Sequence, residues 1–304
     1  MTELETESTR CGFVALIGAP NAGKSTLVNQ VVGAKVSIVT HKVQTTRAIV
    51  RGVVLSGSAQ IVFVDTPGIF APRLRLDRAM VDTAWTGARE ADVMALLIDA
   101  RKGLDEENEA ILARAADLSG PRLLLLNKID MVPPERLLEL TKQVNDRVAF
   151  DRTFMISALN GSGVDDFIHH LAEAVPSGPW LYPEDQISDL PMRNLAAEIT
   201  REKLYLRLHD EIPYRMTVET ALWKELKDGS VRIEQTLFVE RDSQKKIVIG
   251  KGGQAIKAVS AAARTEIAEM IERPVHLFLF VKVRDKWADD PERYREMGLE
   301  FPSD

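Results

Sequence analysis

The stretch "GAPNAGKS", residues 18–25, decides the fold of this chain. It lies directly after an apolar run, 13–17, and opens a helix-forming stretch. Its first and sixth residues are glycines, and a lysine and a serine follow, as in the pattern G-x-x-x-x-G-K-[ST]. Such a turn lets backbone N–H groups and the helix N-terminus face a phosphate. We therefore predict a nucleotide phosphate loop that contains Gly18, Asn21, Ala22, Gly23, Lys24, Ser25 and Thr26.

The chemistry of Mg²⁺-dependent nucleotide sites assigns roles to side chains of this loop and of a second motif. Lys24 is expected to reach the β and γ phosphates, and the Ser25 hydroxyl to bind Mg²⁺. The second motif, "DTPG" at 65–68, begins where an apolar strand ends. A carboxylate there can hold the metal's water shell, while the Gly68 N–H can bind the γ phosphate and move when that phosphate leaves. We therefore predict that Asp65 and Gly68 complete the phosphate side of the site.

The motif "NKID" at 127–130 follows another apolar run and predicts the base. The Asp130 carboxylate can accept both N1–H and the exocyclic amino group of guanine, whereas adenine would leave it without a partner. Guanine is therefore the predicted base, with Asn127 tying this loop to the phosphate loop and the Lys128 stem covering the base. A tripeptide after the next strand completes the predicted nucleotide-binding residues: Ser157, Ala158 and Leu159. The backbone N–H of its central residue can face the guanine carbonyl oxygen.

Apolar runs rich in Val, Ile, Leu and Phe alternate with helix-forming stretches between residues 12 and 175. They predict an α/β domain with a mainly parallel, doubly wound sheet and helices on both faces. A proline-rich segment, 176–191, ends this pattern and is expected to link it to a second domain. There, the order helix, strand, strand, helix, helix, strand predicts a small α+β unit at 192–285. The expected flexible N-terminus is 1–11, and the expected tail is 286–304.

The bulk composition limits the class of protein. With 304 residues and 45% hydrophobic composition, the chain is long enough for two domains with sizeable cores. Its net charge of -6 argues against a uniformly basic protein but permits a local basic patch. Cys11 is the single cysteine, and the first ten residues lack the apolar core of a signal peptide. The expected location is the cytoplasm, with peripheral contact at the inner face of the cell membrane left open.

On the motifs quoted above, residues 12–175 resemble the GTPase domain of the translation-factor-related class. The segment "THKVQTTRAIV", 40–50, resembles the switch segment of that class. The resemblance implies that Thr45 or Thr46 completes the Mg²⁺ shell, and we favour Thr46, which precedes the arginine; a surface strand is the alternative. The implied ligands are GTP or GDP and Mg²⁺. The implied catalytic set is Lys24, Thr46 and Gly68, and the implied metal set is Ser25, Thr46 and Asp65.

One departure from Ras-like enzymes bears on the rate of hydrolysis. Ile69 follows Gly68, where those enzymes carry the glutamine that orients the attacking water. Isoleucine cannot polarise water, so we expect slow intrinsic GTP hydrolysis, with backbone groups, a cation or a partner placing the water. Asn21 matches the asparagine with which several relatives bind K⁺ near the phosphates, and capping of a turn is the alternative. K⁺ is therefore a further candidate cofactor, with the turn-capping role of Asn21 as the alternative.

A second glycine turn lies in "VIGKGGQAIK", residues 248–257. No hydroxyl residue for Mg²⁺ follows it. A G-x-x-G between a predicted β-rich run, 247–249, and a helix is the signature of a KH domain, which clamps single-stranded nucleic acid. Between residues 243 and 265 there are five basic and no acidic residues, so a basic patch is expected. The predicted RNA-binding residues are Lys245, Lys246, Val248, Ile249, Gly250, Lys251, Gly252, Gly253, Ile256 and Lys257, whose apolar members either face the bases or pack in the core.

Together the two units resemble the Era-like GTPases, a family with a C-terminal type II KH domain, over nearly the whole chain. The segments "GPWLYPEDQISD", 178–189, and "KVRDKWADD", 282–290, add to the resemblance. It implies a monomeric GTP-hydrolysing switch that binds single-stranded 16S rRNA near its 3′ end and acts in assembly of the small ribosomal subunit. Two alternatives stay open: an RNA-binding module whose nucleotide is a structural cofactor without turnover, and a membrane-associated GTPase with its basic patch on anionic lipid.

Overall fold

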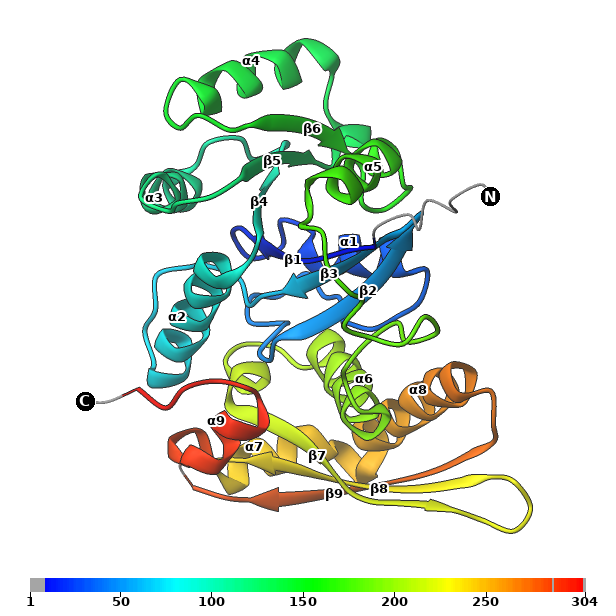
Figure 1. Ribbon diagram of the computed structural model, residues 1–304. Helices are drawn as coiled ribbons and strands as arrows, with labels where there is room; N and C mark the ends of the chain where they lie inside the picture. The colour runs from blue at the N-terminus through cyan, green and yellow to red at the C-terminus, as the bar shows by residue number, and fades with distance from the viewer. Residues whose placement is uncertain (1–8, 286, 303–304) are drawn as a thin grey trace, which may run out of the picture.

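The computed structural model describes residues 9–285 and 287–302 and contains two units that follow each other along the chain (Figure 1). The first is built on a six-stranded sheet with the strand order β2-β3-β1-β4-β5-β6. Its elements are β1 (Arg10–Ile17), α1 (Lys24–Val32), β2 (Val50–Ser56), β3 (Ala59–Asp65), α2 (Arg75–Glu90), β4 (Val93–Asp99), α3 (Glu106–Ala116), β5 (Arg122–Asn127), η1 (Ile129–Met131), α4 (Pro134–Asn145), β6 (Arg152–Ile156) and α5 (Val164–Ala174).

The sheet of the first unit is parallel except at β2, which pairs antiparallel with β3. Its apolar strands are buried on both faces, as continuous apolar runs require. One face packs against α1 and α5 through residues such as Leu27 and Phe167, and the other packs against α2, α3 and α4 through residues such as Trp85 and Leu137. The predicted doubly wound α/β class is thereby confirmed.

The second unit has a three-stranded sheet with the order β7-β8-β9. One face of this sheet packs against α6 and α8, which lie above it in Figure 1. Its elements are α6 (Met192–Arg207), η2 (Ile212–Arg215), β7 (Met216–Glu225), β8 (Val231–Val239), α7 (Asp242–Ile249), η3 (Lys251–Gly253), α8 (Gln254–Ile271) and β9 (Val275–Val283). The unit is of the predicted α+β type, although its helix α7 was not predicted.

The predicted β-rich run 247–249 is wrong, because these residues form the end of α7. The Gln244 side chain accepts hydrogen bonds from the N–H groups of Glu240 and Arg241, which fixes the start of that helix. The glycine turn therefore connects two helices. What was predicted as a helix after Gly253 with a further helical stretch is one continuous helix, α8.

The ends of the chain pack more closely than the predicted boundaries imply. Arg10 and Cys11 belong to β1, while residues 1–8 of the predicted flexible segment lie outside the described residues. In the C-terminal segment, η4 (Trp287–Asp289) and α9 (Pro291–Glu296) pack against α2, with Trp287 buried. None of the helices within residues 9–285 and 287–302 is long and apolar enough to span a bilayer.

The segment 176–191 lies along the first unit before the chain enters α6. Arg10 and Ser177 form an isolated β-bridge, and the Trp180 Nε1 donates to Ser58 O at 3.0 Å. Near its end, Arg51 Nη1 forms an ion pair of 2.7 Å with Asp189. The segment is therefore fixed to the edge of the first unit at both ends.

Candidate functional site

The phosphate loop connects β1 to α1 at the carboxyl end of the central strand. Gly18 and Gly23 have φ angles of 149° and 108°, which favour glycine. A side chain at Gly18 would also collide with the Leu97 carbonyl, and one at Gly23 would collide with the Asn127 amide. These two positions therefore require glycine for both conformation and space.

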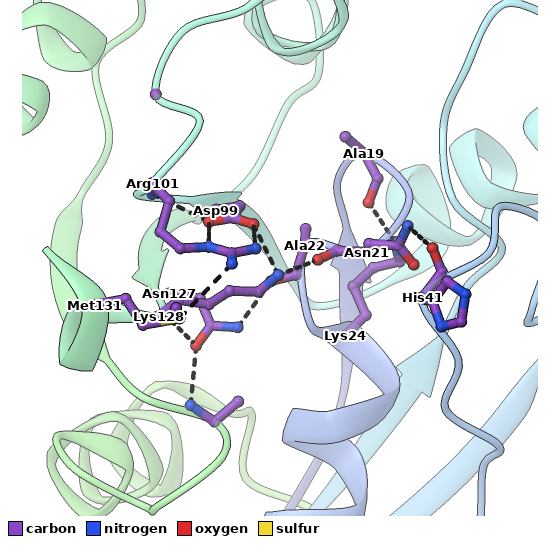
Figure 2. A network of polar contacts seen from close by, with 12 residues as sticks. Ala19, Asn21, Ala22, Lys24, His41, Asp99, Arg101, Asn127, Lys128 and Met131 are labelled. Atoms are coloured by element: carbon purple, nitrogen blue, oxygen red, sulfur yellow. Dashed lines mark hydrogen bonds and ion pairs between the residues drawn. The ribbon is translucent and has the colours of Figure 1, made fainter.

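Lys24 is buried beneath this loop. Its ammonium group donates to the carbonyls of Gly18 at 3.0 Å and Ala19 at 3.2 Å, as Figure 2 shows in part. Burial lowers the pKa of Lys24 to about 8, although the nearby Asp65 carboxylate acts in the opposite direction. The Lys24 ammonium group is thus held by carbonyls of the loop itself, and a phosphate bound in the loop would compete with them for it.

Three predicted metal ligands meet in the structure. The Ser25 hydroxyl donates to Asp65 Oδ2 at 2.7 Å and lies 2.9 Å from the Thr46 hydroxyl. Thr45 instead bonds to the Thr40 hydroxyl at 2.6 Å and the Lys42 carbonyl at 2.7 Å. Among the two threonines it is therefore Thr46 that lies at the cluster, and neither belongs to a strand.

Asp65 is fully buried at the end of β3, as its place after an apolar strand predicts. Its Oδ2 accepts from Ser25 and also from the Ser37 hydroxyl at 2.8 Å, while Oδ1 has no hydrogen-bond partner within the described chain. Burial raises the pKa of Asp65, against the lowering effect of these hydrogen bonds and of Lys24. A buried carboxylate oxygen without a partner suits a hard cation. Ser37 was missed because nothing in its sequence neighbourhood marks it.

The base loop is tied to the phosphate loop by Asn127, as predicted (Figure 2). The Asn127 side chain donates to Ala22 O at 2.8 Å and accepts from the N–H of Lys128 at 2.8 Å and of Ala158 at 2.9 Å. The Ala158 N–H, which was expected to face guanine, is therefore engaged with Asn127. A guanine carbonyl would have to compete for it.

Lys128 crosses from the base loop to the phosphate loop (Figure 2). Its ammonium group donates to Asn21 O at 2.6 Å and to Asp99 Oδ2 at 2.8 Å. Asp99 also accepts two hydrogen bonds from the Arg101 guanidinium, at 3.1 and 2.7 Å. Burial acts to raise the pKa of Asp99, but the bonds from Arg101 and Lys128 outweigh it and lower that pKa to about 2. An ionised Asp99 therefore fixes the lysine that was predicted to cover the base.

Sequence reasoning missed Asp99 and Arg101. A usable signal existed, because Asp99 ends the buried strand β4 just as Asp65 ends β3. The two loops enclose a cavity of about 440 Å³ with the switch segment. It is lined by the phosphate loop, residues of the segment 38–46, Gly68, Asp99, Arg101, Lys102 and Lys128.

Of the other predicted nucleotide residues, Asn21 lines this cavity, whereas Asp130, Ser157, Ala158 and Leu159 are not part of its lining. Asn21 Nδ2 donates to His41 O at 2.8 Å, which joins the phosphate loop to the switch segment. Ile69 is buried against α2, so its side chain is turned into the core. Asp130 and Leu159 are exposed, whereas Ser157 is buried.

The second glycine turn, 250–253, lies between α7 and α8. Gly250, Gly252 and Gly253 have positive φ angles of 74°, 59° and 77°. Lys251 and Gly252 are exposed at its tip, with the basic side chains of Lys246 and Lys257 exposed on the flanking helices. This part of the predicted RNA surface is thus open to a ligand.

The predicted apolar wall is only partly available. Val248 is 1% exposed and packs in the core of the second unit, so it cannot lie against a base. Ile249 and Ile256 are half-buried, as is Lys245. Ile247 was not predicted, yet it is 54% exposed beside the turn. The helical turn of α7, which the strand interpretation overlooked, rotates Val248 inward and Ile247 outward.

Comparison with known proteins identifies both units. A family model described as 50S ribosome-binding GTPase matches residues 13–128, and a KH domain model matches residues 211–288. The GTPase Era of Afipia carboxidovorans is 66% identical over 100% of this chain and 99% of its own length. The GTPase Era of Rhizobium meliloti is 69% identical over 97% of this chain and 94% of its own length.

Two solved structures match the whole architecture. Era in complex with MgGDPNP and nucleotides 1506–1542 of 16S ribosomal RNA has a TM-score of 0.90 and 38% identity. A single-residue variant of Aquifex aeolicus Era bound to GDP·AlF4⁻ has the same TM-score and identity, and each match covers 95% of this chain and 99% of the other. A phosphate loop and guanine-type base loop on a doubly wound sheet, followed by a KH domain, define a P-loop GTPase with an RNA-binding module. Within that class, the chain belongs to the GTPase Era family.

Proposed function

We propose that this protein is a GTP-hydrolysing switch that binds single-stranded 16S rRNA near its 3′ end and acts in assembly of the small ribosomal subunit. The observation that carries the proposal is the meeting of Ser25, Thr46 and Asp65 beside Lys24, in a chain whose second unit presents an exposed G-x-x-G turn. The 16S rRNA bound to the related Era supports the choice of RNA.

Mg²⁺ fits the residues present. The ion prefers oxygen ligands, and the hydroxyls of Ser25 and Thr46 with the buried Asp65 carboxylate supply them. The unpartnered Oδ1 of Asp65 is the atom that a hydrated cation would satisfy. When bound, Mg²⁺ neutralises charge on the β and γ phosphates. These three residues are therefore our proposed metal set.

The protein's own groups would bind and orient the phosphates. Lys24 would exchange its two carbonyl partners for phosphate oxygens, and Gly68 lines the same cavity from the loop after β3, where its N–H would bind the γ phosphate. Ile69 is buried and supplies no polar atom to the attacking water. We therefore expect slow intrinsic hydrolysis, with water placement by backbone groups, by K⁺ near Asn21 or by the RNA-bound state.

A phosphate-release assay separates turnover from a structural nucleotide. The protein should release phosphate from GTP above background, and Lys24→Ala should abolish the release because it removes the phosphate-binding charge. The assay should be run with K⁺ or Na⁺ and with or without RNA. If no condition exceeds background, the alternative of an RNA-binding module with a non-hydrolysed nucleotide would replace the switch.

We further propose that nucleotide state changes RNA binding, because the switch segment and the residues that lead into it, 35–39, are hydrogen-bonded to the KH unit. The Val39 N–H donates to Glu202 Oε1 at 2.9 Å, and Lys35 pairs with Glu202 Oε2 at 2.7 Å. Arg201 donates to the Thr45 carbonyl, one residue before Thr46. A movement of Thr46 on loss of the γ phosphate would therefore act on α6.

Fluorescence anisotropy of a short single-stranded RNA from the 16S rRNA 3′ end tests the RNA ligand and its coupling to nucleotide. The protein would be held with a non-hydrolysable GTP analogue or with GDP. Different RNA dissociation constants in the two forms would support both the RNA ligand and its coupling to the nucleotide state. Equal constants would keep the RNA ligand and refute the coupling for this RNA, and no binding in either form would refute the ligand.

A matched pair of variants assigns the RNA surface. Replacing Lys251 and Gly252 by Asp places negative charge where a phosphodiester would lie, and space around Gly252 is open. RNA binding should fall by at least about tenfold at low salt while GTP affinity stays unchanged. Replacing Lys227 and Gly229, in the exposed turn between β7 and β8, by Asp makes the same change of charge at a glycine that also has positive φ and open space, and serves as the control.

The location of the protein within the cell is also part of the proposal. We place the protein in the cytoplasm, with peripheral contact at the inner membrane face as the competing use of the same basic patch. Liposomes containing anionic lipid should compete with RNA if the patch serves both. Binding to liposomes that RNA does not displace would favour the membrane-associated alternative.

A further inference from the structure

One face of the KH sheet lies opposite α6 and α8, which are above the sheet in Figure 1. Side chains alternate along β9, and Leu277, Leu279 and Val281 pack with those two helices. Phe278 and Phe280 therefore point to the opposite face, where they are 43% and 48% exposed. Neighbouring large apolar side chains that stay exposed on one face mark an interaction surface, whereas single ones are ordinary.

The C-terminal segment covers only one end of this face. Arg293 of α9 lies 5.4 Å from the ring centroid of Phe238, near the end of β8, and forms an ion pair with Glu219. Nearer the other end, Phe278 lies in one row across the three strands with Glu234 and Leu222. Leu222 is also 36% exposed. The open part of the face thus contains three large apolar side chains from β7 and β9.

Basic side chains lie beside these apolar ones. The next row across the sheet contains Lys224 on β7 and Arg232 on β8, and Lys282 follows Phe280 by two residues on β9. All three are exposed. We call this surface the β-face and define it by six residues: Leu222, Lys224, Arg232, Phe278, Phe280 and Lys282.

The carboxylates on the same side of the sheet are already paired. Glu234 forms an ion pair of 2.6 Å with Arg232, and Glu219 pairs with Arg293. The charges of Lys224 and Lys282 therefore make the β-face positive, although the whole chain has a net charge of -6. A positive surface in an acidic protein suits a polyanion.

Planar groups are held in order on the β-face. The Arg232 guanidinium lies 4.8 Å from the ring centroid of Phe278, and Glu234 fixes it through hydrogen bonds of 2.9 and 2.6 Å. Phe278 and Phe280 are two residues apart on one strand, so their rings are separated by about 7 Å along it. Bases of single-stranded RNA stack on aromatic rings and guanidinium planes that a sheet presents beside basic side chains.

We propose that the β-face binds single-stranded RNA by base stacking. The inference rests on the proposed RNA-binding function and adds a second surface to it. Val248 of α7 packs in the core that Leu279 and Val281 border, so α7 and the β-face lie on opposite sides of the sheet. β9 is an edge strand. An RNA strand that leaves the glycine turn after α7 crosses this edge and places its next bases on the two phenylalanines.

Fluorescence anisotropy with two lengths of RNA from the 16S rRNA 3′ end tests the β-face. A G-x-x-G turn clamps about four nucleotides, so an RNA of about six should occupy the turn alone, and one of about twelve should also reach the β-face. The protein is loaded with Mg²⁺ and a non-hydrolysable GTP analogue. The longer RNA should bind the wild type at least about tenfold more tightly than the shorter one.

Leucine and tryptophan variants separate stacking from apolar contact. Phe278→Leu combined with Phe280→Leu keeps apolar side chains but removes the rings. It should lose most of the gain that the longer RNA provides and bind the shorter RNA within about twofold of the wild type. Phe278→Trp combined with Phe280→Trp restores planar rings and should restore that gain. Thermal unfolding of each variant checks that the fold is kept.

Two further variants test charge and position. Lys282→Gln should weaken only the longer RNA and reduce the slope of its salt dependence by about one. Leu138→Ala removes a side chain that is 66% exposed on α4, outside the KH unit, and should change neither RNA dissociation constant.

The outcomes distinguish this inference from the proposed function. If neither RNA binds the wild type, the proposed RNA ligand fails and the β-face proposal fails with it. If the shorter RNA binds but the leucine variant leaves the gain from length unchanged, or weakens both RNAs equally, the RNA ligand stands and the β-face proposal is overturned. A changed sedimentation coefficient of that variant with unchanged RNA binding would assign the face to a second copy of the chain.

Discussion

At the scale of single residues, the nucleotide site places a lysine and an aspartate of opposite charge type in a buried position. Lys24 and Asp65 are both withdrawn from water, and burial disfavours the charged form of each. The site is thus prepared for ligands that restore those charges. Nucleotide phosphates would stabilise the ammonium form of Lys24, and a divalent cation would stabilise the carboxylate form of Asp65.

Nucleotide affinity should therefore depend on pH. The pKa of Lys24 is about 8 in the structure, and a bound phosphate would raise it. Above that pH the free protein loses the Lys24 proton while the complex keeps it, so binding takes up a proton. The dissociation constant for GDP should be constant below pH 8 and should rise by up to about tenfold per pH unit above it. Titrations with a fluorescent GDP at pH 7 to 9 measure this.

Lys24→Arg is the control for that pH dependence. Arginine stays protonated throughout this range, so the variant should bind more weakly at pH 7 but lose the slope. A slope that persists in Lys24→Arg would show that another group titrates.

Base selectivity should follow a single carboxylate. Asp130 lies exposed on η1, two residues after the anchored Lys128. In Asp130→Asn an amide replaces the double acceptor, so preference should shift from guanine toward xanthine by about 10²-fold or more. Competition between GDP and xanthosine diphosphate gives the ratio, with Asp117→Asn at the end of α3 as the control. Unchanged guanine selectivity in Asp130→Asn would refute the base-reading role.

At the scale of elements, the turn between α7 and α8 depends on one glycine more than on its neighbours. A Cβ at Gly250 would lie 2.7 Å from that of Ala255, whereas nothing lies within 4 Å of one at Gly252 or Gly253. Gly252 and Gly253 lie in the left-handed region, with ψ of 19° and 13°, whereas Gly250 has ψ of 172°, a combination that is almost exclusive to glycine, so the difference is both conformational and steric. The turn is therefore tightly packed at its start and open at its tip.

Alanine substitutions at the packed start and at the open tip of the turn should have different effects on stability. Gly250→Ala adds a steric clash to the backbone strain and should lower the free energy of unfolding by more than about 2 kcal/mol. Gly252→Ala meets only the strain and should cost about 1 kcal/mol. Urea denaturation followed by circular dichroism compares them. Equal losses of unfolding free energy in the two variants would mean that α8 relaxes freely around a side chain at position 250.

The same elements show what could be predicted from the sequence. The parallel strands of the first unit and the phosphate loop were predictable because local signals, a continuous apolar run and a spaced glycine pattern, coincide with the tertiary fold, whereas the antiparallel strand β2 was not predicted. The run 247–249 was misassigned because three apolar residues in a row suit a strand and a buried helix end equally. Ser37 and Arg47 could not be predicted, since their partners lie at positions distant in the sequence.

At the scale of the whole molecule, the two units share an interface centred on α6. Glu202 is 3% exposed and receives the Val39 N–H, Lys35 and Lys203. Lys35 and Lys203 both reach Glu266 on α8 as well. The residues that lead into the switch segment are therefore bonded to two helices of the KH unit.

Removing Glu202 should uncouple the units. Glu202→Ala leaves the Val39 N–H without its acceptor and weakens the hold on Lys35, while the nucleotide site itself is untouched. The ratio of RNA dissociation constants between the GTP-analogue and GDP forms should move toward one, with GTP affinity changed by less than about twofold. Glu269→Ala, on the same helix as Glu266 but outside this cluster, is the matched control. A ratio that stays at the wild-type value in Glu202→Ala would show that the interface transmits nothing through this residue.

The fixed connecting segment sets the geometry of any such movement. Its last anchored residue is Asp189, and α6 begins at Met192, which leaves two residues that can span at most about 7 Å. Leu190, the first of them, packs against the cores of both units. A movement of the KH unit would therefore be a rotation about this pivot and not travel on a tether. The glycine turn would keep a constant distance from Leu190, so the switch could change the direction in which an RNA is presented far more than its distance from the pivot.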